Sequence, residues 1–190
     1  MRKVLIPTDF SRNAWDAIAY AVDLFKNEPC EFYILNVYSL ADFATDNLMV
    51  PQLDSTLVDT FRENSEKGLE KVLQRLSFRD ESDMHSFVTL SQQNDLIVAL
   101  KEIVELKDIG LIVMGTKGST DALNISFGSN TVTVMEKIRN CPVLAIPKGT
   151  IYTSVSEIVF PTSFKTHFKK RELDYLIDIA KITNAPIRVL

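Results

Sequence analysis

Three of the chain's six glycines and one serine stand in the segment 115–129 with the spacing G-x-x-G-x9-G-S. They are Gly115, Gly118, Gly128 and, directly after the last glycine, Ser129. Glycine lets backbone N–H groups approach a phosphate without an intervening Cβ, and it permits the positive φ of tight turns. The amides of a helix N-terminus and a serine hydroxyl are further donors for an anion. The pattern predicts a cradle for a phosphate chain; glycines that serve only the backbone are the alternative.

Two residues elsewhere fit the sugar and the base of a nucleotide. Asp9 follows the apolar segment 3–7, and a carboxylate there accepts hydrogen bonds from ribose hydroxyls. Val37 stands near the end of the apolar segment 30–38 and would offer backbone N–H and C=O groups to an adenine edge. Each also has a structural interpretation, Asp9 as a turn or cap residue and Val37 as part of the core. Lys117 would reach a terminal phosphate or lie in solvent.

These residues must be positioned by alternating strands and helices. Continuous apolar runs predict buried strands at 3–7, 30–38, 84–90, 110–115 and 141–147. Apolar residues at helical spacing predict helices at 11–25, with Ser11 as N-cap, at 55–76, at 94–107 and after Gly128. Residues 39–54 read as an irregular loop. The alternation predicts a doubly wound α/β fold with a parallel sheet, whose ligands bind beyond the carboxyl ends of the strands.

The C-terminal part repeats the opening of the chain. EIVFPTSFK at 157–165 matches KVLIPTDFS at 3–11, with Ser163 in the place of Asp9. A helix and a second strand follow in the same order, and the repeat then stops. One helix and two strands are too little for an independent core. The chain is therefore a fragment of a tandem protein, or the repeat packs on the first domain or on another subunit.

Composition excludes several classes of protein. The apolar content of 46% and the charged content of 24% are globular values. The net charge is −4 and no basic run exceeds three residues, which disfavours nucleic-acid binding. No apolar segment has the length of a signal-peptide core or a membrane helix. Cys30 and Cys141 lie in apolar surroundings without CxxC spacing, which predicts buried free thiols and a cytoplasmic protein.

No catalytic or metal-binding constellation emerges from the sequence. His85 and His167 are isolated, and we expect surface or partly buried positions for them. Asp80, Glu81 and Asp83 lie in a connecting segment and are expected to be solvated. The P-loop and the nucleophile elbow are absent.

The segments VLIPTDFS, LIVMGTKG and CPVLAIP, together with the glycine spacing, resemble a universal stress protein domain of the ATP-binding kind. The resemblance covers residues 1–148, and residues 151–190 look like a partial second domain. It implies an adenine nucleotide alpha hydrolase-like sheet of order 3-2-1-4-5, with ATP between strands 1 and 4. It also implies a homodimer through the fifth strand, Pro142–Pro147. Gly110 stands where the family often has an acidic residue.

Carried over position by position, the resemblance gives a nucleotide site and no catalytic residue. The site comprises Pro7, Thr8, Asp9, Val37, Met114, Gly115, Thr116, Lys117, Gly118, Gly128, Ser129, Asn130 and Thr131. The cofactor implied is ATP, with Mg²⁺ as its companion ion. We expect a binding module of the stress response whose nucleotide state alters its shape or partners. Slow ATP hydrolysis, adenylyl or phosphoryl transfer is the alternative, and a structural protein with an empty cradle is a third.

Overall fold

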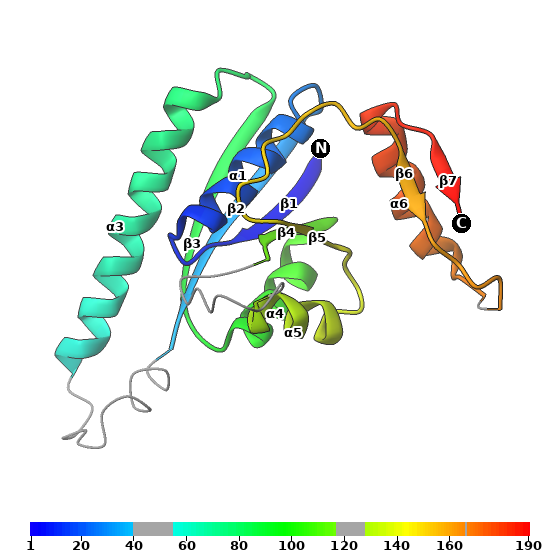
Figure 1. The fold of residues 1–190 in the computed structure, drawn as a ribbon. Helices are drawn as coiled ribbons and strands as arrows, with labels where there is room; N and C mark the ends of the chain where they lie inside the picture. Colours follow the sequence, from blue (N-terminus) through cyan, green and yellow to red (C-terminus); the bar gives the residue numbers. More distant parts are fainter. Residues whose placement is uncertain (40–54, 117–127, 166) are drawn as a thin grey trace.

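The computed structural model describes residues 1–39, 55–116, 128–165 and 167–190. In them, one parallel sheet has the strand order β3-β2-β1-β4-β5, which confirms the predicted fold (Figure 1). Its strands are β1 Arg2–Pro7, β2 Cys30–Tyr38, β3 His85–Gln93, β4 Leu111–Gly115 and β5 Val143–Ile146. β1 lies at the centre, hydrogen-bonded to β2 on one side and to β4 on the other.

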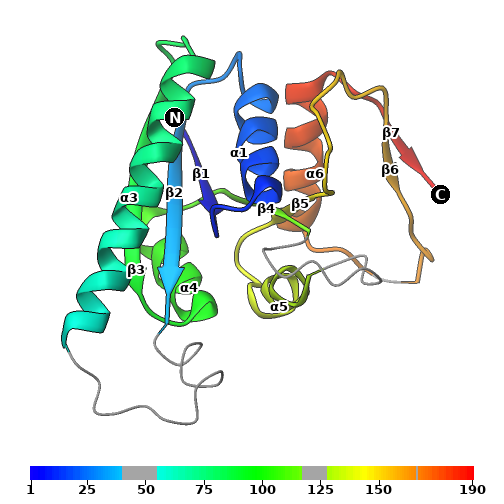
Figure 2. The same cartoon turned by 60° about the vertical axis from the view of Figure 1, so that its left-hand side comes forward.

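Helices cover both faces of the sheet. They are α1 Arg12–Leu24, α3 Ser55–Arg79, α4 Leu96–Lys107 and α5 Ser129–Lys137. Buried side chains of α1 and α3 pack on one face, and those of α4 and α5 pack on the other (Figure 2). Ser11 is the N-cap of α1, as predicted, and its hydroxyl accepts from the Ala14 N–H at 3.2 Å. α3 runs to Arg79, three residues beyond the predicted end.

β1 shows why its sequence is apolar without interruption. Val4 and Ile6 face the α1/α3 side and Leu5 faces the α4/α5 side, and all three are fully buried. Strands covered on both faces need apolar residues at every position. Burying each such side chain contributes roughly 1.5–3 kcal/mol. The central strand therefore anchors both layers.

Residues 151–190 contain a second, two-stranded parallel sheet. Its elements are β6 Ile158–Phe160, α6 Lys170–Thr183 and β7 Ile187–Val189. The register of β6 on β7 reproduces that of β1 on β2: Ile158 pairs with Ile187 as Val4 pairs with Phe32. The sequence repeat is thus also a repeat of strand pairing.

The C-terminal unit contacts the first one at several points. Arg2 Nη1 donates to Asp178 Oδ2 at 2.6 Å, which joins the start of β1 to α6. The rings of Tyr20 and Tyr152 meet edge to face, with centroids 5.3 Å apart. Ile179 of α6 packs against the core cluster on the α1/α3 face. In the structure the repeat therefore packs against the unit that contains the five-stranded sheet.

One prediction about the acidic loop residues is wrong. Asp80 lies in the loop after α3, but its side chain is only 9% exposed, and it accepts from His85 Nδ1 at 2.6 Å. The second ring nitrogen, Nε2, donates to the Phe25 carbonyl at 3.0 Å. The His85 side chain is fully buried, so this histidine holds the start of β3 to the ends of α1 and α3.

Two other predictions from composition can be compared with the structure. Cys30 and Cys141 are buried free cysteines, as predicted. Burial raises the pKa of the Cys30 thiol to about 12, so the thiol stays protonated and unreactive at neutral pH. None of the helices in the described ranges has both the length and the apolar composition that crossing a membrane requires.

The buried pair gives a prediction for stability. Replacing His85→Leu should lower the free energy of unfolding by about 3 kcal/mol, because the Asp80 carboxylate stays buried without its partner. Urea denaturation would measure the loss. Asp83→Asn, which changes an exposed carboxylate of the same loop, should cost less than about 0.5 kcal/mol. A His85→Leu loss no larger than this control would contradict the assigned role.

Candidate functional site

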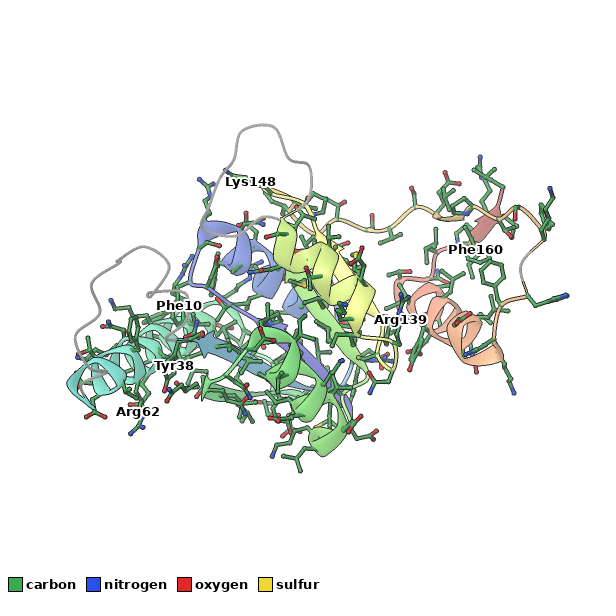
Figure 3. All side chains as sticks on the ribbon, turned by 90° about the horizontal axis from the view of Figure 1, so that it is seen from below. Phe10, Tyr38, Arg62, Arg139, Lys148 and Phe160 are labelled. Atoms are coloured by element: carbon green, nitrogen blue, oxygen red, sulfur yellow. The ribbon has the colours of Figure 1, made fainter. Side chains whose placement is uncertain are left out.

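The predicted site lies where β2, β1 and β4 end. These three strands are neighbours in the parallel sheet, so their carboxyl ends share one edge, which Figure 3 views from below. Gly128, which precedes α5, reaches the same edge because its N–H donates to the Thr116 carbonyl just after β4. Predicted residues from four separate segments are therefore brought to one edge of the sheet.

β1 is shorter than β2 at this edge, and a side chain terminates its ladder. The Thr8 N–H donates to the Leu35 carbonyl at 2.8 Å, the last bond from β1 to β2. The Thr8 carbonyl accepts from Asn36 Nδ2 at 2.7 Å, so an amide side chain occupies the next ladder position. Thr8 and Asn36 are both buried. β2 continues past this point to Tyr38 without β1 beside it.

The backbone of Val37 faces the space beyond the end of β1. Successive residues of a strand direct their N–H and C=O groups to opposite neighbours. The Leu35 carbonyl accepts from Thr8 on the β1 side, whereas the Tyr38 carbonyl accepts from Asn94 on the β3 side at 3.2 Å. The backbone N–H and C=O groups of Val37 are therefore directed to the β1 side. Its side chain packs against the core beneath α4 and α5. Val37 can therefore be a core residue and still offer its backbone groups at the end of β1.

Asp9 stands in the turn that leads from β1 to α1. Its Oδ1 atom accepts a hydrogen bond from the Ser11 N–H at 3.0 Å. Asp9 therefore stabilises the turn, which is the structural interpretation that the sequence also allowed. Thr8 Oγ1 accepts from the Phe10 N–H at 3.0 Å and tightens the same turn. Asp9 itself is exposed where β1 ends. The turn thus presents a carboxylate to solvent in a fixed place.

The glycine after β4 has a packing role different from the predicted one. Gly115 is not at positive φ; a Cβ at Gly115 would lie 2.5 Å from Asn13 Nδ2 and 2.9 Å from the Asn13 carbonyl oxygen. Gly128 has φ −66° and ψ 146°, an ordinary extended conformation. The positive-φ turn is therefore not found at Gly115, whereas Gly128 opens the next helix as predicted. Lys117 and Gly118 lie outside the described residues.

The start of α5 offers backbone donors at the same edge. The first amides of a helix have no acceptor within the helix, and among the described residues no side chain caps α5, in contrast to α1 and α4. Ser129 and Asn130 are exposed there. Thr131 is 2% exposed, and its hydroxyl donates to the Gly115 carbonyl at 2.8 Å. Thr131 thus ties α5 to the end of β4, and the exposed hydroxyl is that of Ser129.

The remaining predicted residues form the floor of this edge. Pro7, Met114 and Thr116 are buried, and the Thr116 N–H donates to the Ile146 carbonyl at 2.9 Å. In the described part of the chain no three histidine, cysteine, aspartate or glutamate side chains gather as a metal site. The chemistry available is hydrogen bonding by backbone amides, a hydroxyl and a carboxylate.

Sequence analysis missed a contact that positions the Asp9 turn. Phe10, labelled in Figure 3, has φ 63°. Its ring lies against Gly68 of α3 so closely that a Cβ at Gly68 would overlap it. The only sequence signal was a glycine inside an otherwise regular helix, which costs helix stability unless something packs there. Gly68 and Phe10 together hold the turn against α3.

Comparison with known proteins places this arrangement in a family. The profile described as the Universal stress protein family matches residues 1–147. Universal stress protein MJ0531 of Methanocaldococcus jannaschii is 29% identical over 147 residues, which is 77% of this chain and 82% of that protein. Universal stress protein MJ0577 of the same organism is 28% identical over 163 residues, which is 77% of this chain and 95% of that protein.

Solved structures share the fold. Universal stress protein UspA from Lactobacillus plantarum has a TM-score of 0.63 at 21% identity, with 76% of this chain and 97% of that chain covered. A universal stress protein from Archaeoglobus fulgidus has a TM-score of 0.71 at 19% identity, covering 98% of this chain and 65% of that one. A universal stress protein in complex with cAMP has a TM-score of 0.53 at 16% identity, covering 76% and 96%.

The contact between Phe10 and Gly68 can be tested by a double-mutant cycle. Gly68→Ala in a Phe10→Ala background should raise the free energy of unfolding by about 0.5–1 kcal/mol, the usual gain in a helix interior. In the native background the gain should shrink or reverse, because the new methyl group displaces the ring. Urea denaturation of the four proteins gives the coupling. Equal gains in the free energy of unfolding in both backgrounds would show that the position of the Phe10 ring does not depend on the missing side chain at Gly68.

Proposed function

The chain belongs to the universal stress protein family, and from its crevice geometry we propose that it binds ATP as a nucleotide-dependent module of the stress response. One observation carries the proposal: the polar groups at the crevice edge come in the order of the parts of a nucleotide. The amides of α5 beside β4 suit phosphates, Asp9 after β1 suits ribose, and the Val37 backbone on β2 suits adenine. Neighbouring strands are about 4.8 Å apart, so three strand ends span about 10 Å, the scale of an adenosine moiety.

The phosphate end of the proposed site uses a charge effect of the fold. The uncapped N-terminus of α5 carries partial positive charge, and its amides with the Ser129 hydroxyl would bind phosphate oxygens. Asn130 is exposed beside them. Mg²⁺ commonly binds through phosphates and one or two carboxylates, and Asp9 is the carboxylate at this edge. These groups bind and orient a nucleotide, so we propose a binding module.

Comparison with the family supports an adenine nucleotide as the ligand class. The cAMP complex shows that one protein of this fold accepts an adenine nucleotide. In the present chain the base-facing group is backbone, and adenine offers both a donor and an acceptor on one edge, as a peptide unit requires. Binding would link the turn after β1, the end of β2 and the start of α5, which gives nucleotide occupancy a route to the protein's shape.

The domain organisation is part of the proposal. We assign residues 1–148 to one universal stress protein domain and residues 151–190 to part of a second. The matching register of β1–β2 and β6–β7 supports this assignment, as does a shared turn: Phe164 has φ 58°, and its N–H donates to Thr162 Oγ1 at 3.1 Å. Phe10 has the same arrangement with Thr8. The second unit has Ser163 in place of Asp9, so we assign ATP to the first domain alone.

A homodimer through Pro142–Pro147 also remains a proposal, and strand direction gives its test. The Pro142 and Ile146 carbonyls accept from β4, so Val143 and Ala145 direct their backbone groups to the open side of β5. Ala145→Pro removes one outward N–H and leaves the ladder to β4 intact. Light scattering should give a dimeric mass for the native chain and a monomeric mass for this variant. A native chain that is monomeric at micromolar concentration would contradict the proposal.

ATP binding should appear as stabilisation of the folded chain. ATP at 100 times its dissociation constant should stabilise the fold by about 2.7 kcal/mol and raise the melting temperature by several degrees. Asp9→Asn should weaken binding roughly tenfold because it removes a charged acceptor for the ribose. The asparagine side chain can still accept from the Ser11 N–H, so the melting temperature without ligand should change little. Thermal denaturation with and without ATP measures both effects.

A matched control lies in the repeat. Ser163→Asn changes the position that corresponds to Asp9 and should leave ATP binding unchanged. Isothermal titration calorimetry of the folded protein with ATP, ADP and AMP at millimolar concentration would decide the proposal, since the absence of heat with all three would refute it. Equal weakening by both substitutions would refute the assignment of the ribose to Asp9.

A further inference from the structure

The outer edge of β3 has the properties of a strand-docking surface. β3 ends the sheet, and among the described strands only β2 pairs with it. Its sequence, HSFVTLSQQ, contains no proline, lysine or arginine, the residues that commonly block the edges of natural sheets. Its one titratable side chain, His85, is buried in the contact with Asp80. Among the described residues, this nine-residue strand therefore has an edge that no other strand pairs with.

The direction of each backbone group on this edge follows from the ladder to β2. The Met84 carbonyl and the Asn94 N–H both bond to β2. Even-numbered residues of β3 therefore face β2, and Phe87, Thr89 and Ser91 direct their N–H and C=O groups outward. These three residues offer the alternating donors and acceptors that an added strand requires.

A groove of about 510 Å³ runs beside this edge, between β3 and α3, which lie side by side in Figures 1 and 2. Its lining combines acidic and apolar residues of α3 with residues of β3: Glu66, Leu69, Glu70, Leu73, Thr89, Leu90 and Ser91. The Ser65 and Ser91 hydroxyls, 2.7 Å apart, join helix and strand at its base. Glu66 and Glu70 are exposed, and none of the described residues that line the groove is basic.

The two carboxylates match the spacing of an extended peptide. Glu66 and Glu70 are one helical turn apart, a rise of about 6 Å along α3. Residues two apart on one face of a strand are separated by about 6.6 Å. Two lysine or arginine residues at positions i and i+2 of an added strand would therefore reach both carboxylates. Leu69 and Leu73 would contact the aliphatic parts of those side chains.

The opposite face of β3 favours polar residues in the same partner. Ser86 Oγ and Gln92 Oε1 are buried atoms, and neither has a hydrogen-bond partner within the described ranges. Both residues belong to the even-numbered set, whose side chains lie on the α4 side with Val88 and Leu90. A strand added beside β3 would bring its own polar side chains next to these atoms.

We propose that the outer edge of β3 binds an extended segment of another protein, with basic residues toward α3 and polar residues toward α4. A second copy of this chain fits less well, because pairing two β3 edges would bring Glu66 and Glu70 of both copies together. Charge complementarity therefore selects a basic partner. The proposal uses neither the crevice nor ATP, so each can fail without the other.

A designed peptide provides the test. The probe is fluorescein-labelled Val-Thr-Lys-Thr-Lys-Thr-Val-Thr-Val, and its counterpart carries glutamate in place of lysine. Fluorescence anisotropy should show that the lysine probe binds the native chain and the glutamate probe does not. The double variant Glu66→Lys with Glu70→Lys should bind the lysine probe about tenfold or more weakly than the native chain does. It should bind the glutamate probe more tightly than the native chain does. The matched control, Glu102→Lys with Glu105→Lys, reverses two exposed charges on α4 and should change binding by less than about twofold.

Two further measurements separate strand addition from simple charge attraction. Thr89→Pro removes an outward N–H without touching the ladder to β2, and it should also weaken the lysine probe by about tenfold. Hydrogen exchange at Phe87, Thr89 and Ser91 should slow when the probe binds. The proposal is overturned by no binding at millimolar probe, by equal loss in the α4 control, or by light scattering that shows a dimer broken by Thr89→Pro.

Discussion

The hydrogen-bond ladder of β1 is the constraint on which the proposed nucleotide site depends. β1 pairs with β2 and β4 at once, so its neighbours are parallel and end at the same edge. It stops at Pro7, while β2 continues to Tyr38. On the β1 side, this difference in length leaves the Val37 backbone with no described strand next to it, and the Asp9 turn follows the end of β1 there. A β1 two residues longer would use the Val37 N–H in the sheet and fill the crevice with backbone.

Close approaches by glycine set the positions of the helices around that edge. The start of α1 reaches β4 because Gly115 leaves room for Asn13, and the turn before α1 reaches α3 because Gly68 leaves room for Phe10. The absence of a side chain thus serves packing within the chain at both sites. The phosphate binding that we propose would come instead from the first amides of α5, which Thr131 holds against the end of β4.

The sequence predicted features that depend on neighbours in the chain and missed those that depend on distant partners. The two-faced burial of β1 and the cap at Ser11 follow from local pattern, and both are observed. Asp80 looked like a solvated loop residue because nothing nearby in sequence reveals that His85 is buried against it. The role of Gly115 could not be predicted for the same reason, since its partner lies on α1. The predicted phosphate loop at Lys117 and Gly118 lies outside the described residues, so the spacing remains its only support.

The repeat separates what forms the turn from what gives it chemistry. The Thr8 N–H closes onto Leu35 and the Thr162 N–H closes onto Leu190, both at 2.8 Å, and the phenylalanine two residues later has positive φ in each copy. The second copy has serine in place of Asp9, and among the described strands β6 has no counterpart of β4. The turn therefore also forms where no strand corresponds to β4. In both copies the threonine hydroxyl accepts from the phenylalanine N–H, and the residue between them, Asp9 or Ser163, accepts from the N–H two residues later. In the first domain this makes the turn a preformed platform, so a nucleotide that binds there would spend little free energy on ordering it.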